Sequence, residues 1–144
     1  MIRKVLLKDA PNIQRINKLS LGYDYPITAA TQQLQQLLSE PQHHLLLAAV
    51  DDDDQLIGYV HAEVYLETYA PKLFNVLALA VDQDSRGQGL GKALMIALVG
   101  KASEFQVHGI RLNSGSERTA AHQFYEHLGY TTTKMQKRFF LELP

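Results

Sequence analysis

The sequence predicts a single domain of the α/β (α+β) class, because apolar strand-like runs alternate along the chain with amphipathic helical segments. The clearest example is an apolar run at 76–81 that passes through a glycine-rich turn into a helix. The length of 144 residues suits one domain with a sizeable core, and no repeat, linker or low-complexity segment divides it. We expect about six to seven strands and about four helices over residues 1–144.

Hydrophobic spacing and turn residues predict the order of these elements. After a short apolar stretch at the start, Asp9 can cap a helix that has Pro11 in its first turn. Glycine and proline in residues 20–26 then end that helix. The expected elements are a strand at 2–7, helices at 9–19 and 28–39, strands at 44–50, 55–67 and 73–81, a helix at 90–105, a strand at 110–113, a helix at 118–128, and a closing hairpin at 130–134 and 138–143.

Four consecutive aspartates, residues 51–54, lie between two of the expected strands. Such a run could bind a cation. A single turn rarely points four carboxylates inward, however, so we interpret the run as a solvated hairpin turn.

The most informative segment is Arg86-Gly87-Gln88-Gly89-Leu90-Gly91, at the junction between a strand and a helix. Glycines at every second position leave a backbone without side chains in the way, next to the positive end of a helix dipole. The N–H groups can therefore point at one anion, and a phosphate or pyrophosphate is the expected ligand. A glycine-rich turn that serves packing alone is the alternative.

Two common nucleotide motifs do not fit this segment. In a dinucleotide fingerprint that starts at Gly87, the third glycine would fall on Lys92. In a nucleotide P-loop, Arg86 and Ala93 would occupy the positions of the first glycine and of the hydroxyl residue that binds magnesium. Neither a dinucleotide site nor nucleoside triphosphate hydrolysis is expected.

A second motif lies downstream, where Tyr125 in the stretch Ala120 to Tyr130 is followed four residues later by Gly129-Tyr130. With Arg86 to Gly91 matching the pattern [QR]-x-x-G-x-[GA], the chain resembles the GCN5-related N-acetyltransferase (GNAT) superfamily over nearly its whole length. The resemblance implies a GNAT fold, in which a central mixed, mostly antiparallel sheet has splayed central strands. It also implies transfer of an acetyl group from acetyl-CoA to a primary amine of a small molecule or a protein, by direct attack in a ternary complex.

The resemblance further implies which residues hold the coenzyme. In the family, the pantetheine arm lies between the splayed strands, and main-chain amides of the glycine-rich turn hold the pyrophosphate. A fixed N–H near the thioester carbonyl also stabilises the oxyanion that develops on attack. The matching positions are Leu79, Ala80, Val81, Arg86, Gly87, Gln88, Gly89, Leu90, Gly91, Lys92, Asn113, Arg118 and Tyr125.

Tyr125 matches the tyrosine that lies near the coenzyme sulfur in the family, where it acts as general acid. The general base is less clear, because Leu77 stands where many relatives have a glutamate. On the preceding strand, alternation puts His61 and Glu63 on one face, and either could accept the proton directly or through water. A solvent-exposed polar face is the alternative for this strand.

The acceptor site is expected to be built from the break between the first two helices and from the closing hairpin. Tyr23, Asp24 and Tyr25 offer aromatic walls and a carboxylate for an amine, although they could equally form an ordinary loop. A non-catalytic acetyl-CoA or CoA sensor is the second hypothesis, since the usual glutamate is missing. Retention of Tyr125 argues against it.

Composition limits the remaining possibilities. A net charge of −1 gives no support for a nucleic-acid partner, and the absence of cysteine excludes disulfides, thiol nucleophiles and thiolate metal sites. We expect no metal. No stretch has the ~20 apolar residues of a membrane span, and the apolar run near the start is too short for a signal peptide. A cytoplasmic protein, monomeric or homodimeric, is expected.

Overall fold

In the computed structural model, which describes all 144 residues, the chain divides into two compact units, Met1–Asn113 and Ser114–Pro144. The first unit contains a five-stranded sheet, and the second contains one helix. The strands are β1 (Ile2–Lys4), β2 (His44–Val50), β3 (Leu56–Glu67), β4 (Ala70–Val81) and β5 (Ile110–Leu112). The helices are α1 (Ala10–Ile16), α2 (Ile27–Leu38), α3 (Leu90–Gly100), α4 (Ala102–Phe105) and α5 (Thr119–His127), with 3-10 turns η1 (Leu7–Asp9) and η3 (Gln83–Ser85) and a π-helical segment η2 (Asn17–Leu21).

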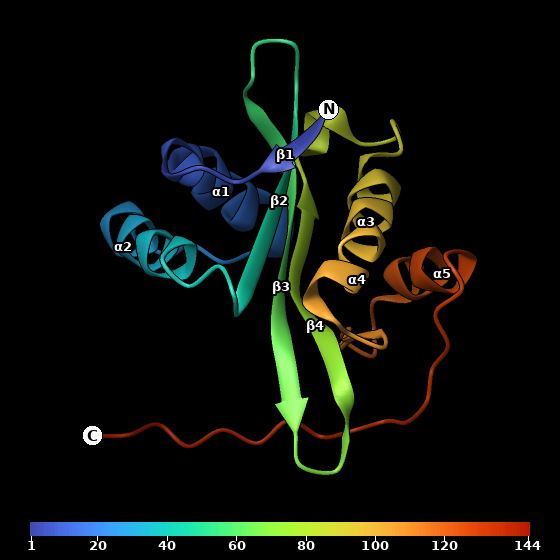
Figure 1. Cartoon of the computed structure of the whole chain (residues 1–144). Helices are drawn as coiled ribbons and strands as arrows, with labels where there is room; N and C mark the ends of the chain where they lie inside the picture. The colour runs from blue at the N-terminus through green and yellow to red at the C-terminus, as the bar shows by residue number, and fades with distance from the viewer. The chain divides into compact units, whose positions relative to one another are not determined.

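The sheet has the strand order β1-β2-β3-β4-β5. All neighbouring pairs are antiparallel except β4 and β5, which are parallel. Helices α1 and α2 cover one face of this sheet and α3 covers the other, as Figure 1 shows. The mixed, mostly antiparallel sheet that the sequence analysis expected is therefore present.

The expected number of strands was wrong, because the closing hairpin at 130–134 and 138–143 does not form. Residues 131–144 contain neither helix nor strand. Thr131 to Thr133 have good strand propensity, but propensity alone does not make a strand without a hydrogen-bonded partner. The linking residues Met135 to Lys137 also lack the glycine, asparagine or aspartate that tight hairpin turns need.

The number of helices also differs, because the single helix expected at 90–105 is two helices. The break comes at Lys101, whose φ of −93° and ψ of −6° end α3 before α4 begins. Gly100 precedes the break, and glycine weakens a helix interior. The apolar pattern runs through both helices and could not reveal the interruption.

Strand β4 contains a bulge that changes which of its residues face α3. His61 of β3 pairs with Ala78, but the next residue, Ala62, pairs with Val76, so Leu77 is an extra residue. Because side chains alternate along a strand, the extra residue reverses the alternation. Val76 therefore faces the same side as Leu79, and Ala78 and Ala80 face α1 and α2.

The two faces of the sheet form two apolar layers. Under α1 and α2, the buried side chains include Ile16, Leu34, Leu46 and Tyr59. On the other face, α3 contacts β2, β3 and β4. Its buried side chains are Leu94, Met95 and Leu98. The core thus fixes β3 and β4 from both sides.

Asp9 does not cap α1 as expected. Its carboxylate is 3% exposed and accepts two hydrogen bonds from the Arg3 guanidinium, at 2.8 and 2.9 Å, and one from the Leu6 N–H at 2.8 Å. Burial disfavours the charged carboxylate, but the hydrogen bonds and the charge of Arg3 outweigh it and hold the pKa of Asp9 below its usual value. An ion pair with two parallel hydrogen bonds thus ties β1 to the start of α1.

Replacing Asp9 with asparagine is expected to lower the free energy of unfolding by about 2 kcal/mol, because the half-buried Arg3 loses the buried one of its two carboxylate partners. Since the folded pKa of Asp9 lies below the unfolded value of 3.8, its stabilisation is present above that value and is lost as the pH falls through the folded pKa. Urea unfolding should therefore show a difference at pH 7 that shrinks below about pH 4. Asp52→Asn, at an exposed turn position, should change little.

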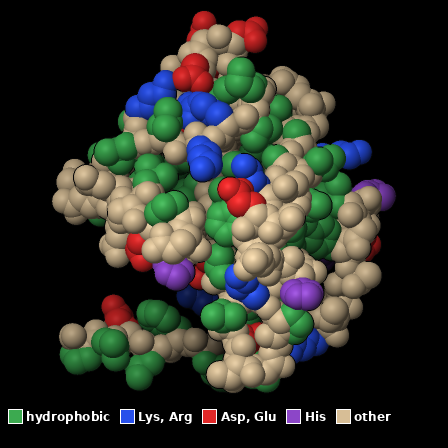
Figure 2. Space-filling model, in the orientation of Figure 1, with side chains coloured by type: hydrophobic (Ala, Val, Ile, Leu, Met, Phe, Trp, Pro, Cys, Tyr) green, Lys and Arg blue, Asp and Glu red, His purple; other side chains and the backbone are tan.

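The acidic turn at 51–54 joins β2 to β3, and the acidic side chains lie beside Lys and Arg side chains at the top of Figure 2. Asp54 pairs with Arg3 at 2.8 Å and with Lys8 at 2.6 Å. Asp51 accepts hydrogen bonds from the N–H groups of Asp53 and Gln55. Two of the four carboxylates thus have structural partners within the turn and the N-terminal segment.

Candidate functional site

The edge of β4 has an open stretch after the bulge. Strand β5 pairs with β4 only at Phe74, Asn75 and Val76, so the rest of β4 has no strand beside it on this edge. The Asp82 N–H donates to the Ile57 carbonyl, and hydrogen-bonded pairs in an antiparallel ladder alternate. The N–H groups of Leu79 and Val81 therefore point away from β3, toward the open edge.

Beyond β4, the chain makes the glycine-rich turn. Gly87 has a φ of +83° and Gly89 a φ of +75°, which side-chain-bearing residues rarely adopt. A Cβ atom would meet nothing within 4 Å at either glycine, so these positions need glycine for its backbone conformation and not for space. The turn then enters α3 at Leu90, with Gly89 as its N-cap.

The amides at this helix start are unused. No side chain caps α3, and within Met1–Asn113 the N–H groups of Gln88 and Gly89 have no hydrogen-bond acceptor. The first N–H groups of any helix lack partners inside it, so those of Leu90 to Lys92 are open as well. This group of amides can bind an anion.

A polar cluster links β3, β4 and β5 on the face opposite α3. The Asn75 side chain donates to Glu63 at 2.7 Å and accepts from Arg111 at 3.1 Å. The Arg111 guanidinium lies 4.6 Å from the ring centre of Tyr65 and donates to Asn113 at 3.4 Å. Asn75 and Arg111 were missed from the sequence, because only the strand register brings them beside Glu63.

His61 lies on the same face of β3 as Glu63. Its ring Nε2 is 3.0 Å from Nδ1 of His44 on β2. Burial lowers the pKa of His61 to about 4, and the neighbouring His44 adds to the effect. The imidazole is therefore neutral at neutral pH.

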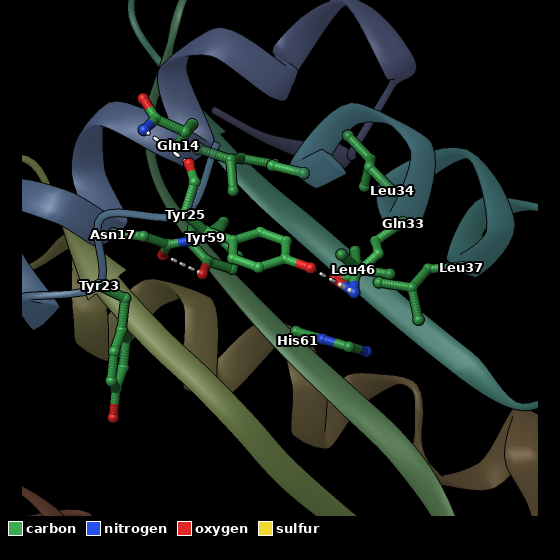
Figure 3. Close-up of a pocket in the computed structure, with 12 residues that line it drawn as sticks. Gln14, Asn17, Tyr23, Tyr25, Gln33, Leu34, Leu37, Leu46, Tyr59 and His61 are labelled. Atoms are coloured by element: carbon green, nitrogen blue, oxygen red, sulfur yellow. Dashed lines mark hydrogen bonds between the residues drawn. The ribbon is translucent and has the colours of Figure 1, made fainter. Parts of the chain in front are cut away.

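A cavity of about 150 Å³ lies between α1, α2 and the strands β2 and β3. Figure 3 shows the ring of Tyr25 reaching across it toward Gln33, while the Asn17 amide accepts a hydrogen bond from the hydroxyl of Tyr59. The lining comprises five aliphatic, three aromatic and three amide side chains with one histidine: Ile13, Ala30, Leu34, Leu37, Leu46, Tyr23, Tyr25, Tyr59, Gln14, Asn17, Gln33 and His61.

The structure thus brings two of the three expected acceptor residues to a cavity. Tyr23 and Tyr25 line it, but Asp24 does not and lies 3.8 Å from Lys18. Gln14 and Gln33 were not anticipated, although Gln33 has helical spacing with the apolar residues Leu34 and Leu37.

The segment before Tyr23 is joined to the end of β4. The Ser20 hydroxyl donates to the Val81 carbonyl at 3.0 Å, and the Gln83 amide donates to the Leu19 carbonyl at 2.9 Å. These bonds hold η2 beside the open stretch of β4. The expected acceptor and coenzyme segments are therefore neighbours within the first unit.

The second unit contains two further expected residues, Tyr125 and Arg118. Tyr125 lies on α5 between the rings of Phe124 and Tyr130, at centroid distances of 5.1 and 5.9 Å. Burial raises the pKa of Tyr125 above its usual value, and the charge of Arg118 at the helix N-cap partly opposes this. His122 is bonded to the Gly115 carbonyl at 2.9 Å.

No group of three or more His, Asp or Glu side chains is arranged to hold a metal ion. None of the helices has the length and apolar composition needed to cross a membrane.

Several solved structures share this fold. A transcriptional regulator from Bacillus halodurans C-125 superposes with a TM-score of 0.86 at 19% identity, covering 98% of this chain and 99% of that one. An acetyltransferase from Trypanosoma brucei superposes with a TM-score of 0.78 at 17% identity, covering 98% of this chain and 99% of that one. Glucosamine-6-phosphate N-acetyltransferase from Arabidopsis thaliana superposes with a TM-score of 0.80 at 16% identity, covering 99% of this chain and 98% of that one.

Comparison with curated proteins found no significant match. A family model gives a clear assignment. The model of the acetyltransferase (GNAT) family matches residues 10–130, and the chain therefore belongs to this family.

Proposed function

We propose that the protein transfers an acetyl group from acetyl-CoA to a primary amine of a small molecule or a protein, by direct attack of the amine in a ternary complex. The observation that carries the proposal is the open edge of β4 leading directly into the amide-lined turn at Gln88 to Lys92. An extended pantetheine arm would bind along that edge as a further strand would. The pyrophosphate would then lie on the amides at the start of α3.

The same edge supplies a group for the chemical step. When the amine attacks the thioester, negative charge develops on the carbonyl oxygen. The Leu79 or Val81 N–H can stabilise this charge, because a main-chain donor held in a sheet needs no rearrangement during the reaction.

Tyr125 is proposed as the proton donor to the departing thiolate. Burial raises the pKa of the phenol, so the hydroxyl carries its proton at neutral pH. Proton transfer to the thiolate of a thiol of pKa about 8.5 is uphill, and the raised pKa of the phenol makes it more so; hydrogen bonding to the developing charge therefore supplies part of the effect. Residues 1–144 are proposed to act as one acetyltransferase domain.

Glu63 is proposed as the base, acting directly or through water. An alkylammonium of pKa about 10.4 is mostly protonated at pH 7, so a proton acceptor is needed. The hydrogen bond from Asn75 to Oε2 fixes the carboxylate, and Oε1 has no hydrogen-bond partner and is available to accept a proton. His61 is the second choice, since its imidazole is neutral and close by in sequence.

The Glu63→Gln variant is expected to lose about ten- to a hundredfold in turnover near neutral pH with an alkylamine acceptor. Raising the pH toward the pKa of the amine should restore much of the rate, because the deprotonated acceptor no longer needs a base. The measurement is the pH dependence of kcat/KM in a thiol-release assay.

The His61→Gln variant is the matched comparison. If histidine is the base, this variant shows the alkaline recovery and Glu63→Gln does not. If both variants showed the wild-type pH dependence of kcat/KM, bulk water or another group would accept the proton.

A panel of amines tests the whole proposal. Thiol release from acetyl-CoA should depend on the presence of an amine, and a coenzyme titration in parallel should show micromolar binding, about −8 kcal/mol. Binding without release for every amine would favour the non-catalytic sensor. An absence of coenzyme binding would refute both functions.

A further inference from the structure

The cavity beneath α1 and α2 has no charged lining. Its walls contain no Asp, Glu, Lys or Arg, and its one histidine is neutral because burial lowers the pKa of His61 to about 4. Asp24, the one carboxylate in the adjoining loop, lies outside the lining, where it is 3.8 Å from Lys18 and accepts a hydrogen bond of 3.5 Å from the lining residue Gln14. A charged group placed in the cavity, which is partly open to solvent, would lose part of its water and gain no ion pair with the lining in return.

The cavity nevertheless offers hydrogen bonds at its rim. Gln14 donates to the Tyr25 carbonyl at 3.0 Å, and the Gln33 amide lies 3.5 Å from the Tyr25 hydroxyl. Below them, Leu34, Leu37 and Leu46 form an apolar floor. Aromatic and aliphatic walls with a few amides are typical of sites for neutral small molecules.

The volume sets the size of the occupant. A dry apolar cavity of about 150 Å³ admits a group as large as benzene. The cavity has this volume, so one ring or a branched aliphatic chain of similar size fits, and a disaccharide does not.

The position connects the cavity to the open stretch of β4. His61 lines the cavity and pairs across the sheet with Ala78, the residue between the bulged Leu77 and Leu79. Cross-strand partners lie about 5 Å apart at their Cα atoms. A group held in the cavity can therefore extend an attached amine toward the main chain at Leu79.

We propose that this cavity binds the neutral, apolar part of the acceptor, so that the preferred substrates are primary amines carrying one aromatic ring or branched alkyl group and no second charge. The inference rests on the proposed function and specifies its substrate class. Amines that carry a phosphate, a carboxylate or a second ammonium group are poor acceptors.

The first test compares acceptors of similar size. 2-Phenylethylamine and 3-methylbutylamine are expected to exceed 4-aminobutyrate, 1,4-diaminobutane and glucosamine 6-phosphate in kcat/KM by about tenfold or more. Equal or higher values for the anionic or dicationic amines would overturn the proposal.

The second test introduces a cation into the lining. Gln33→Arg is expected to lower kcat/KM for 2-phenylethylamine by about tenfold and to raise it for 4-aminobutyrate, mainly through KM. Gln35→Arg is the matched control, because Gln35 lies on the same helix, is exposed and is not part of the lining. Similar effects of the two substitutions would show that general surface charge, and not the cavity, determines the preference.

The third test reduces the volume. Ala30→Leu is expected to raise the KM for 2-phenylethylamine by about tenfold while leaving that for ethylamine and acetyl-CoA unchanged, because only the larger amine needs the space. A parallel rise for ethylamine, or no rise for 2-phenylethylamine, would contradict the assignment.

Direct binding separates this proposal from the proposed function. In NMR titrations of the full chain, 2-phenylethylamine should shift the resonances of Tyr25, Leu34 and His61, and Ala30→Leu should weaken these shifts. Shifts without turnover would support the cavity and refute the enzyme. Turnover without shifts at these residues would support the proposed enzyme function and refute the assignment of the cavity.

Discussion

The Gly89→Asp variant is expected to bind acetyl-CoA at least about a hundredfold more weakly than the wild type. The substitution forces a side-chain-bearing residue into a φ of +75° and places a carboxylate beside the amides proposed to hold the pyrophosphate. Like charges at an anion site cost several kcal/mol, which corresponds to at least this loss. Isothermal titration with acetyl-CoA measures the effect, and circular dichroism verifies that the variant is folded.

Two companion substitutions show whether the position matters. Gly91→Asp should also largely abolish binding, since residue 91 lies in the first turn of α3. Gly100→Asp places the same side chain at the other end of this helix, in open space and without positive φ, and should leave the affinity within about twofold. Wild-type affinity in folded Gly89→Asp and Gly91→Asp would remove the turn from the coenzyme site.

The Tyr125→Phe variant is expected to lose roughly ten- to a thousandfold in kcat, the range for loss of one acid or hydrogen-bond donor. The phenyl ring keeps the contacts with Phe124 and Tyr130. Affinity for acetyl-CoA should therefore change little. Steady-state kinetics with a productive amine, together with coenzyme titration, separates the two quantities.

Tyr130→Phe is the control for this variant. It removes the hydroxyl from a neighbouring ring, and that hydroxyl is buried without a hydrogen-bond partner. Turnover close to wild type is expected. If the Tyr130→Phe variant lost turnover and the Tyr125→Phe variant did not, the proton donor would be Tyr130.

Much of the first unit could be predicted from the sequence. The strands β2, β3 and β4, the helix start at Leu90 and strand β5 lie within a few residues of their expected bounds. These elements have strong local signals, namely long apolar runs, alternation, and glycines that positive φ requires. Tyr23 and Tyr25, which were expected in the acceptor site, lie in the lining of the cavity, and proline and glycine mark the loop that carries them.

The remaining features depend on partners distant in the sequence. The tail after Tyr130 has strand-like composition, yet Phe139, Phe140 and Leu141 are exposed and unpaired. The carboxylate of Asp9 bonds to the Arg3 guanidinium and to the Leu6 N–H, and not to an amide of α1, because its partners come from the segment before the helix. The cavity at Gln33 depends on the packing of two helices on two strands, and no pattern within α2 alone contains it.

The bulge at Leu77 also sets how β4 can change in length. A deletion or insertion of one residue in a regular strand exchanges its inner and outer side chains up to the next bulge or turn. In β4 one such exchange is already present, so deletion of Leu77 would give Val76 and Ala78 consecutive partners on β3 and restore an uninterrupted ladder. Removal of Val76 or Ala78 would let Leu77 take the vacated position in the ladder, so that Phe74 and Ala80 would keep their apolar layers. Loss of one residue among related chains is therefore expected to be tolerated at residues 76–78 of the strand and rejected on both sides of them.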